Sequence, residues 1–367
     1  MTSPQHMQAD ARSERPSVSG LGKLKRRVKT LGLQFLYNSG FASVIGRVYG
    51  GQGVILMFHE FTHNPRERLD QGCRISDFEE LLGSIRKSGR DILTFDEAHR
   101  RLEDPAGRPF VVLTFDDGYR SNLELALPVM ERYEAPATIF VPTQMMTREI
   151  NAWWLGLRHM VLTNDRIDME PMGIRIECPD VDGKIATLRR LTAWVWDDFH
   201  RADMLGHVFD AHRVLLPDLV ESLVMSEADM IAADRHPLIE IGAHTTTHRA
   251  LTLLSETEVK DDIGANKRFL EERLGREVPY FAYPYGAPSL SGHREADIVK
   301  ALGFTAAMTT EPGCLFPEHF ADPYLIPRQD AEYTEDSRTQ ALCGMNGIFR
   351  ALASRGGRPL VNAGAIL

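Results

Sequence analysis

Short apolar runs alternate with longer mixed segments along the first 140 residues and again after residue 237. The apolar runs have the length of buried strands, and the mixed segments repeat apolar positions at helical spacing. Strands that alternate with helices are typical of parallel sheets with helical crossovers. We therefore predict an α/β fold with strands at 54–58, 92–95, 111–115, 137–141, 238–243, 279–283, 304–308 and 324–327.

Helices are predicted between these strands. The first carries Ser76 with Glu79 three residues later, the pattern of a capping box at a helix start. The others show apolar positions at the spacing of amphipathic helices. The predicted helices cover 76–88, 96–102, 123–133, 256–274, 295–302 and 339–353.

The alternation stops between residues 142 and 237, where only helical patterns occur. We predict helices near 153–161, 185–199, 204–215 and 226–233, the last with Ser226 and Asp229 as a capping pair. We interpret 142–237 as a helical insertion at the mouth of the sheet or barrel. Trp153 and Trp154 could stack on a sugar ring, although two tryptophans on one helix more often pack in a core.

The two ends of the chain differ from its middle. Residues 1–20 are polar and are expected to be a disordered lead-in, and 336–367 should form a closing helix and tail. Residues 21–50 predict a basic and then apolar helix, which either lies on an anionic membrane surface or packs on the barrel with its charges in solvent. Its basic residues are Lys23, Lys25, Arg26, Arg27 and Lys29, and its apolar ones are Leu31, Leu33, Phe35, Leu36, Phe41, Val44 and Ile45.

Composition narrows the function. The chain has 367 residues and a formal net charge of -9, so it is a poor general binder of nucleic acid. Its four cysteines form no Cys-x-x-Cys pair, and it shows neither a secretory signal nor an apolar run long enough to cross a membrane. We expect a cytoplasmic protein, with membrane association through residues 21–50 as a possibility. No oligomeric state is predicted.

Two adjacent carboxylates, Asp116 and Asp117, end the apolar run 111–115 and precede a glycine. They are either a helix N-cap or a pair held at a chemical site. Like charges at close range oppose each other's ionisation unless a cation or a proton intervenes. The second interpretation therefore assigns one carboxylate to a metal and the other to a base.

Two histidines follow a second predicted strand, just as the two carboxylates follow the strand at 111–115. His244 follows the run 238–243, and His248 comes four residues later, a spacing that lets both imidazoles reach one cation. With Asp117 they form a two-histidine, one-carboxylate set, which leaves positions open for water and substrate. The set predicts one divalent metal ion, with zinc favoured and iron, cobalt or nickel compatible, and Asp116 as the base.

Three motifs carry a resemblance to a known family: Thr-Phe-Asp-Asp-Gly at 114–118, His-Thr-Thr-Thr-His at 244–248 and Phe-Ala-Tyr-Pro-Tyr-Gly at 281–286. They resemble the first three motifs of the polysaccharide deacetylase family, the nodulation-type chitooligosaccharide deacetylases of carbohydrate esterase family 4. The resemblance implies a distorted (β/α)7-type barrel, here over 51–335. It also implies metal-dependent N-deacetylation, Asp116 as base, and an oxyanion site at Pro284 and Tyr285, where the backbone N–H of Tyr285 donates.

The chain departs from the family pattern in two places. Ala282 stands where the family usually has an arginine that orients the base, and Arg328 is either its replacement or an ordinary ion-pair residue. No clear C-terminal Leu-x-His supplies the usual catalytic acid, and His319 lies outside that pattern. His59, at the end of the first strand, could fill this role as in circularly permuted members, with His63 as the second candidate.

The expected activity is removal of N-acetyl groups from an N-acetylhexosamine-containing oligosaccharide, polysaccharide or glycolipid precursor. Two alternatives remain open from the sequence. One is a non-catalytic carbohydrate-binding relative, suggested by the missing arginine and acid. The other is a metal amidase that acts on a non-sugar amide.

Overall fold

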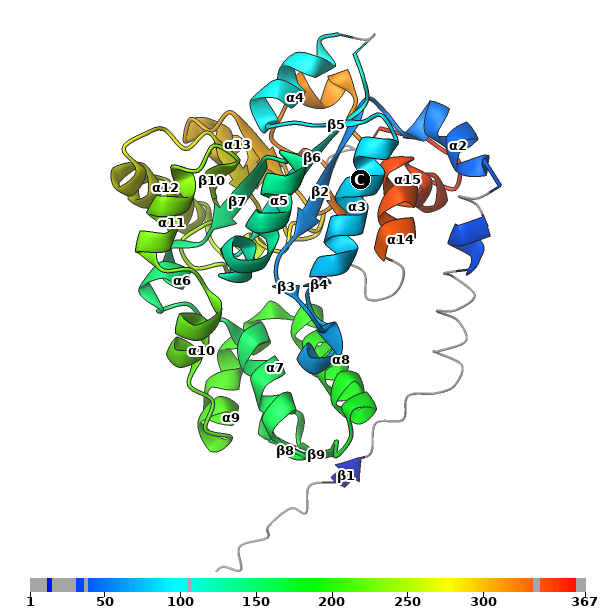
Figure 1. Ribbon diagram of the computed structural model, residues 1–367. Coiled ribbons are helices and arrows are strands. Elements are labelled where there is room, and N and C mark those ends of the chain that lie inside the picture. Colours follow the sequence, from blue (N-terminus) through cyan, green and yellow to red (C-terminus); the bar gives the residue numbers. More distant parts are fainter. Residues whose placement is uncertain (1–11, 15–30, 36–38, 105–106, 333–336, 361–367) are drawn as a thin grey trace, which may run out of the picture. The chain divides into compact units, whose positions relative to one another are not determined.

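The computed structural model describes residues 12–14, 31–35, 39–104, 107–332 and 337–360. The chain divides into two compact units (Figure 1). One consists of Met1–Leu24 and Asn151–Leu219, and the other of Lys25–Ile150 and Val220–Leu367.

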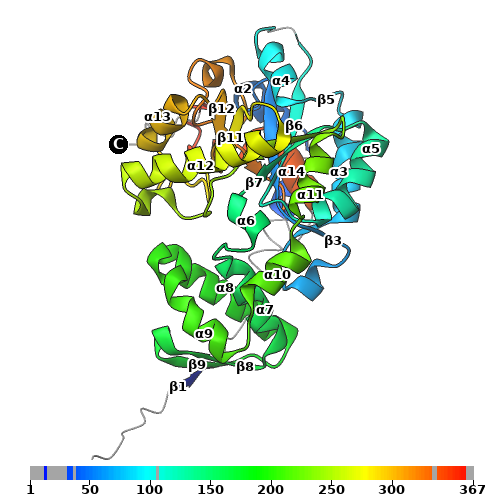
Figure 2. The same cartoon turned by 90° about the vertical axis from the view of Figure 1, so that its left-hand side faces the viewer.

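A parallel sheet forms the centre of the larger unit, with strand order β12-β11-β10-β7-β6-β2-β13 and β5 paired to β6 (Figure 2). This confirms the predicted distorted (β/α)7-type barrel. The strands are β2 (Gly53–Phe58), β5 (Asp91–Ile92), β6 (Phe110–Asp116), β7 (Ala137–Val141), β10 (Ile239–Ala243), β11 (Tyr280–Ala282), β12 (Ala306–Met308) and β13 (Gln329–Asp330).

One segment, residues 326–330, joins the two edges of this curled sheet. Ile326 forms a parallel bridge with Met308 of β12. Only three residues later, Gln329 and Asp330 pair with Leu56 and Met57 of β2 at the other edge. Arg328 lies between these two contacts, and it is therefore held at the seam of the barrel.

Both faces of the sheet are buried, and alternate residues of a strand face opposite sides. Phe110 and Val112 of β6 join an apolar cluster with Phe140 of β7. Val111 and Leu113 belong instead to the larger cluster under the surrounding helices. Thr114 and Asp116 share the parity of Val112, so they point into the barrel.

Helices surround the barrel, and α12 and α13 lie side by side on one flank (Figure 2). The glycine-terminated α12 is the longest predicted helix, and its bounds match the prediction. Besides the N-terminal helices described below, the helices of the larger unit include α3 (Ile75–Lys87), α4 (Phe95–Leu102), α5 (Leu127–Tyr133), α6 (Thr143–Thr147), α11 (Glu227–Asp234), α12 (Glu256–Leu274), α13 (His293–Ala301), α14 (Ser337–Met345) and α15 (Ile348–Ala353).

Helix ends give both confirmations and corrections. Ser226 and Asp229 form the predicted capping box of α11. The predicted box at Ser76 is wrong, because α3 begins one residue earlier and Arg74 occupies its N-cap without a side-chain bond. A capping box that was not predicted occurs at α4, where Thr94 is the N-cap. Because α4 begins at Phe95, the predicted strand 92–95 is shorter and ends at Ile92.

Two further boundaries near the C-terminus differ from the prediction. The last strand lies at Gln329–Asp330 rather than at 324–327, since only Ile326 of that run reaches a strand partner. The predicted helix 339–353 is two helices, α14 and α15, because Gly347 adopts a left-handed conformation between them.

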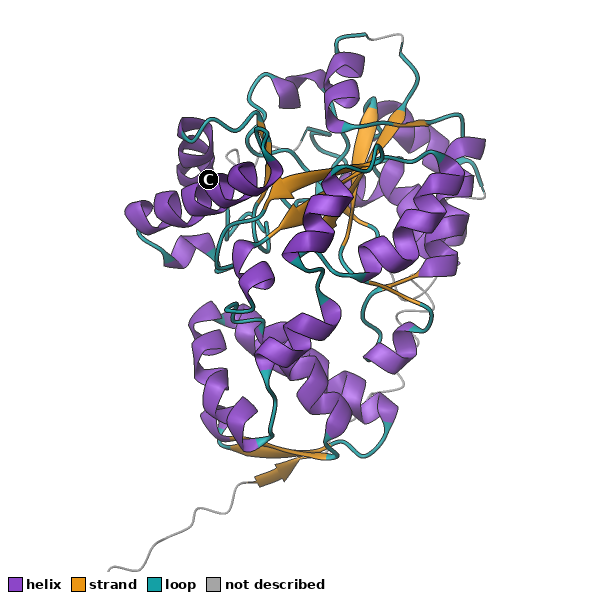
Figure 3. Ribbon diagram, turned by 60° about the vertical axis from the view of Figure 1, so that its left-hand side comes forward, coloured by secondary structure: helices purple, strands orange, loops and turns teal. Residues whose placement is uncertain are grey.

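The smaller unit contains the middle of the predicted insertion (Figure 3). The sequence did not predict its hairpin or Arg12–Glu14, which pairs with the hairpin as β1. Trp153 is buried there and packs edge-on against Trp154 and near Phe199. Its elements include α7 (Trp153–Thr163), β8 (Arg166–Met169), β9 (Ile174–Glu177), α8 (Val181–Asp197) and α9 (Leu205–Ala211), and α10 (Leu216–Leu223) leads back to the larger unit.

The N-terminal region is only partly described, because residues 1–11, 15–30 and 36–38 lie outside the described residues. Residues 31–35 are helical, and α2 (Phe41–Tyr49) follows. Among the helices the structure describes, none is long and apolar enough to cross a lipid bilayer. All four cysteines are free and buried, consistent with the absence of a disulfide framework.

Candidate active site

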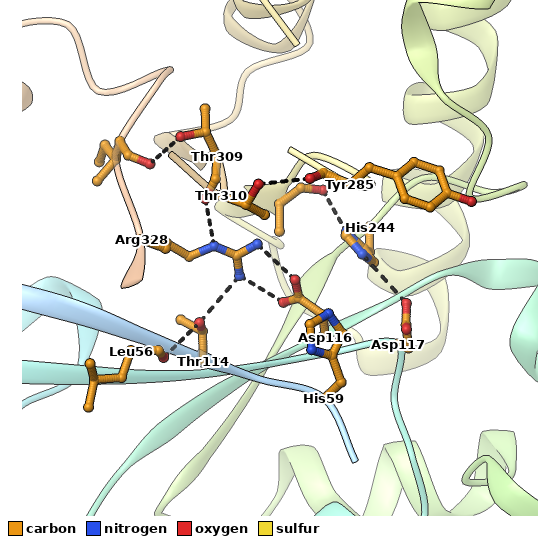
Figure 4. Close-up of polar contacts among 12 residues, drawn as sticks. Leu56, His59, Thr114, Asp116, Asp117, His244, Tyr285, Thr309, Thr310 and Arg328 are labelled. Carbon is orange, nitrogen blue, oxygen red and sulfur yellow. Dashed lines mark hydrogen bonds and ion pairs between the residues drawn. The ribbon is translucent and has the colours of Figure 1, made fainter. Parts of the chain in front are cut away.

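Polar side chains gather where the parallel strands end. His59 follows β2, Asp116 ends β6, His244 follows β10 and Tyr285 lies just beyond β11. Because the carboxyl ends of parallel strands meet at one edge of a barrel, these four segments deliver their side chains to one mouth. Arg328 joins them from the seam (Figure 4).

Asp116 and Arg328 form a two-point ion pair inside the barrel. Arg328 Nη1 and Nη2 each donate to one carboxylate oxygen of Asp116 at 2.7 Å. The guanidinium is fully buried and also donates to the Thr309 carbonyl at 2.9 Å and to the Thr114 hydroxyl at 3.3 Å. Burial opposes ionisation of Asp116, but the charge and hydrogen bonds of Arg328, together with the nearby His244 and His59, outweigh it and lower the pKa of this carboxyl.

Asp117, His244 and His248 form the candidate metal centre, and all three are buried. Asp117 Oδ1 lies 3.2 Å from His248 Nε2 and 3.7 Å from His244 Nε2. Metal–ligand bonds of about 2.0–2.2 Å place neighbouring ligand atoms roughly 3–3.5 Å apart. The three atoms therefore have nearly the spacing that one shared cation requires.

The tautomer of His244 suits metal binding. Its Nδ1 lies 2.6 Å from the carbonyl oxygen of Ala282, so Nδ1 carries the hydrogen and Nε2 presents a lone pair toward Asp117. Burial lowers the pKa of His244 to about 4, which keeps the ring neutral. The backbone N–H of His244 donates to Asn266 Oδ1, and Asn266 donates in turn to the Val141 carbonyl and the Thr143 hydroxyl.

The carboxylate of the centre provides a direct test of fit for a cation. Asp117 Oδ1 is buried, and no described donor makes a well-formed hydrogen bond to it. A buried carboxylate oxygen in that state is unfavourable unless a positive charge compensates it. One anionic oxygen and two neutral imidazoles are a donor set that zinc and other first-row metals accept. The residues present therefore fit a divalent cation.

Four non-glycine residues here adopt left-handed backbone conformations: Asp117, Thr245, His248 and Tyr285. Such conformations cost about 1–3 kcal/mol each and cluster at functional sites. At Asp117 the turn breaks the strand alternation after Asp116, so that consecutive carboxylates serve one site. Neither carboxylate caps a helix: Ser121 occupies the N-cap of the helical turn that follows.

Glu332, which the sequence analysis did not identify, contacts His59. Its carboxylate accepts a hydrogen bond from the His59 backbone N–H and lies 3.4 Å from His59 Nδ1. Asn122 donates to the His59 carbonyl at 2.7 Å. Burial opposes protonation of the ring, but Glu332 and then Asp116 and Asp117 outweigh it and raise the pKa of His59 to about 10.

Pro284 and Tyr285 lie in the loop after β11. The Tyr285 ring packs edge-on against His248, with centroids 4.9 Å apart. The Tyr285 carbonyl accepts a hydrogen bond from the Thr310 hydroxyl at 2.8 Å. The next residue must be glycine, since Gly286 has a positive φ and a Cβ there would lie 2.6 Å from Thr310 N.

Two histidines weighed as catalytic acids lie elsewhere. His63 is exposed on the loop after β3 (Phe61–Thr62). His319 is buried, and its Nδ1 accepts a hydrogen bond from the Phe316 backbone, which is a structural contact. His59, by contrast, interacts electrostatically with both Asp116 and Asp117.

The fold and this site define a (β/α)7-type barrel with a two-histidine, one-carboxylate centre beside a paired aspartate. The polysaccharide deacetylase family model matches residues 103–307, more than half of the chain, and the chain belongs to this family. The matched region includes Asp116, Asp117, His244 and His248. His59, Arg328 and Glu332 lie outside it.

Individual relatives are more distant. The chain is 30% identical over 130 residues to YxkH of Bacillus subtilis (strain 168), a protein named provisionally as a polysaccharide deacetylase, and the match spans 35% of this chain and 42% of YxkH. The Streptococcus pyogenes deacetylase PplD, solved with acetate, superposes with a TM-score of 0.53 at 17% identity, covering 80% of this chain and 97% of PplD. IcaB from Ammonifex degensii gives 0.51 at 19% identity, with 82% and 99% covered. These two structures support the fold.

Proposed function

We propose that the chain is a metal-dependent N-deacetylase that removes acetyl groups from N-acetylhexosamine residues of an oligosaccharide, a polysaccharide or a glycolipid precursor. The observation that carries this proposal is the pairing of Asp116 with Arg328 beside the cluster of Asp117, His244 and His248. A base held ionised next to a cation site is the arrangement that hydrolysis of an unactivated amide requires.

Asp117, His244 and His248 would hold the cation, with zinc favoured and iron, cobalt or nickel compatible with the same ligands. When bound there, a divalent cation supplies polarisation of the amide carbonyl and acidification of the attacking water. The hydrogen bond from His244 to the Ala282 carbonyl fixes the ring in the orientation that ligation needs.

Asp116 acts as the general base. Its carboxylate takes a proton from the attacking water while the water oxygen bonds to the acetyl carbon. Arg328 keeps the carboxylate ionised and fixes its plane through two hydrogen bonds. Arg328 therefore occupies the functional place of the arginine that Ala282 replaces in the third motif, and it acts as a positioning residue.

The leaving side of the reaction involves Tyr285 and His59. The backbone N–H of Tyr285, in the loop begun by Pro284, donates to the oxyanion as it develops, a contribution of about 3 kcal/mol in comparable sites. His59, held by Glu332, gives its proton to the amine nitrogen as the carbon–nitrogen bond breaks. The products are acetate and a free amino sugar.

We infer that the chain resembles the circularly permuted members of the family, because its proposed acid comes before the motifs in the sequence. His59 follows the first barrel strand, and Arg328 and Glu332 come from the closing segment. All three lie outside the residues that the family model matches. This order supports a permuted arrangement in which the acid enters from the N-terminal side of the motifs.

An acetate-release assay tests the proposal. Purified protein is incubated with N-acetylated chitooligosaccharides of several lengths and, separately, with a small cyclic amide. We expect acetate from at least one saccharide, loss of release after chelation, and recovery when a divalent metal is restored. Turnover of the cyclic amide alone would identify a non-sugar amidase, and saccharide binding without any turnover would identify a non-catalytic relative.

A further inference from the structure

We propose that the N-terminal helices of the larger unit form a docking face for an anionic lipid bilayer. The face consists of Leu31, Phe35, Phe41, Val44 and Val48, and each is between 56% and 66% exposed. These five are half of the large apolar side chains that are exposed among the described residues. The proposal does not depend on the proposed function.

The exposed apolar side chains lie on helices that already pack against the barrel unit through other residues. Leu33 and Ala42 from the same two helices are buried in one small cluster with Cys343 of α14 and Ile348 of α15. The two helices are therefore already docked on the barrel unit, and α2 and α15 lie in contact (Figure 1). Leu31 and Phe35 stand one helical turn apart, opposite Leu33, so they form the outward side.

Helix α2 repeats this division. Its buried residues are Ala42 and Tyr49, while Phe41, Val44 and Val48 lie at a spacing of three and four residues on another side. A helix with an apolar stripe on its solvent side is the form that lies flat in a bilayer interface. Burying such a stripe under a protein partner or a bilayer removes it from water.

The sequence of these helices and of the C-terminal helices beside them is basic, which favours an anionic partner. No aspartate or glutamate occurs between residues 15 and 59, and none occurs from 337 to the end of the chain. These two stretches hold eleven of the 42 lysines and arginines and none of the 51 acidic residues. Five of the eleven, from Lys23 to Lys29, come directly before Leu31.

An anionic bilayer matches both properties. The chain as a whole carries a charge of -9 and would be repelled by an anionic surface unless its positive charge is segregated. Basic residues beside an interfacial helix add to its affinity for anionic lipids, and apolar residues enter the acyl boundary. Neither contribution alone gives stable binding, but the two occur here on one segment.

Vesicle co-sedimentation of the full chain provides the test. The probes are vesicles of phosphatidylglycerol with phosphatidylcholine, and of phosphatidylcholine alone, at low and high salt. We expect binding to the anionic vesicles to exceed binding to the neutral ones by about tenfold or more, and to fall at high salt. The triple variant Phe35→Ser, Phe41→Ser, Val44→Ser should reduce the partition coefficient at least about tenfold.

Control variants test whether vesicle binding depends on this face or on any exposed apolar side chain. Leu215 and Met204 are also exposed, in the smaller unit. The variant Leu215→Ser, Met204→Ser should bind vesicles like the parent protein. The triple substitution Lys25→Gln, Arg26→Gln, Arg27→Gln should weaken binding to anionic vesicles, while the circular dichroism spectrum stays that of the parent.

Equal vesicle binding by the parent and by the variant Phe35→Ser, Phe41→Ser, Val44→Ser would overturn the proposal. So would a dimer that the triple variant disrupts while the parent ignores vesicles, since a second copy would then cover the face.

Discussion

Arg328 holds Asp116 through two parallel hydrogen bonds of 2.7 Å, and the two residues are 212 positions apart in the chain. Asp116 ends a strand on the inward side of the barrel, and Arg328 lies on the segment that closes it. A buried, bidentate arginine fixes both the charge and the orientation of a carboxylate. In the proposed mechanism, the pair therefore explains how Asp116 keeps its position as the base although Ala282 stands where the motif usually has an arginine.

Removing the arginine should disable the base. We expect Arg328→Ala to lower kcat by about 100-fold or more, because Asp116 loses both its charge partner and its orientation. The variant should also lose stability, by about 3–5 kcal/mol, since one charge stays buried without its partner. Arg328→Lys should restore the charge but not the two-point geometry, and it should recover only part of kcat.

Placing an arginine at position 282 should rescue the variant that lacks Arg328. Ala282 is buried on β11 with its side chain in the barrel-interior cluster. Adding Ala282→Arg to Arg328→Ala should raise kcat above that of the single variant, because the family places its arginine at this position. A single variant Arg328→Ala that folds and keeps parental kcat would contradict the assigned role.

The metal centre predicts a specific loss of metal affinity. We expect His248→Ala to lower the affinity for zinc by about 100-fold or more, because one of three protein ligands is removed. Metal added to the stripped parent should raise its Tm by mass action, and the variant should lose most of that shift. His236→Ala, at a partly exposed histidine on the loop before β10, is the matched control. Equal zinc affinities for both variants would place the metal elsewhere.

The contact between Glu332 and His59 predicts a pH effect. His59 donates a proton, so activity should fall as pH rises through its pKa, which Glu332 helps to raise to about 10. Glu332→Gln removes that carboxylate and should move the alkaline limb of kcat/KM to lower pH by about one unit or more. Glu131→Gln, on the surface of α5, is the control. An unchanged alkaline limb in Glu332→Gln would mean that another group supplies the proton.

A second pH effect concerns stability, and it arises at the other end of the barrel. Glu240 points into a cavity of about 290 Å³ near the starts of β7 and β10, with Arg276 also in its lining. Burial raises the pKa of Glu240 to about 7, with Asp96 and Asp234 adding to the effect and Arg276 opposing it. The folded state thus favours the protonated form of Glu240. The resulting contribution to folding stability is lost as pH rises from the ordinary pKa of a glutamate through about 7.

Glu240→Gln cannot ionise and should escape this loss. Its unfolding free energy relative to the parent should therefore increase between pH 5 and pH 8, by about 1–3 kcal/mol. Urea unfolding at several pH values measures the difference. Glu272→Gln, an exposed residue of α12, should show no such trend. A pH-independent difference for Glu240→Gln would contradict the shifted pKa.

The strands and the clustering of Asp117, His244 and His248 could be predicted because the sequence patterns that indicate them are local. The run 111–115 has the apolar character of a buried strand, and its two terminal carboxylates have no role in a buried sheet. The spacing of His244 and His248 is likewise local. The same reasoning failed at Ser76, where α3 begins one residue earlier and the expected cap is not formed.

Other features depend on contacts that sequence does not display. Glu332 reaches His59 across 273 positions, and no pattern around it differs from an ordinary acidic surface. The hairpin of β8 and β9 consists of two strands of only four residues each, and β9 also pairs with β1 from the far N-terminal end of the chain. Strands this short show little periodicity in the sequence. The left-handed turn at Asp117 is adopted without a glycine at that position, although Gly118 follows it.

Asp116→Asn gives the most direct test of the central claim, because it removes the base and leaves the metal ligands in place. The measurement is acetate released from an N-acetylated chitooligosaccharide, together with the metal content of the same sample. We predict one divalent metal per chain in both proteins, and acetate release by the variant reduced about 1,000-fold or more. Acetate release at the parental rate by the metal-loaded variant would contradict the account.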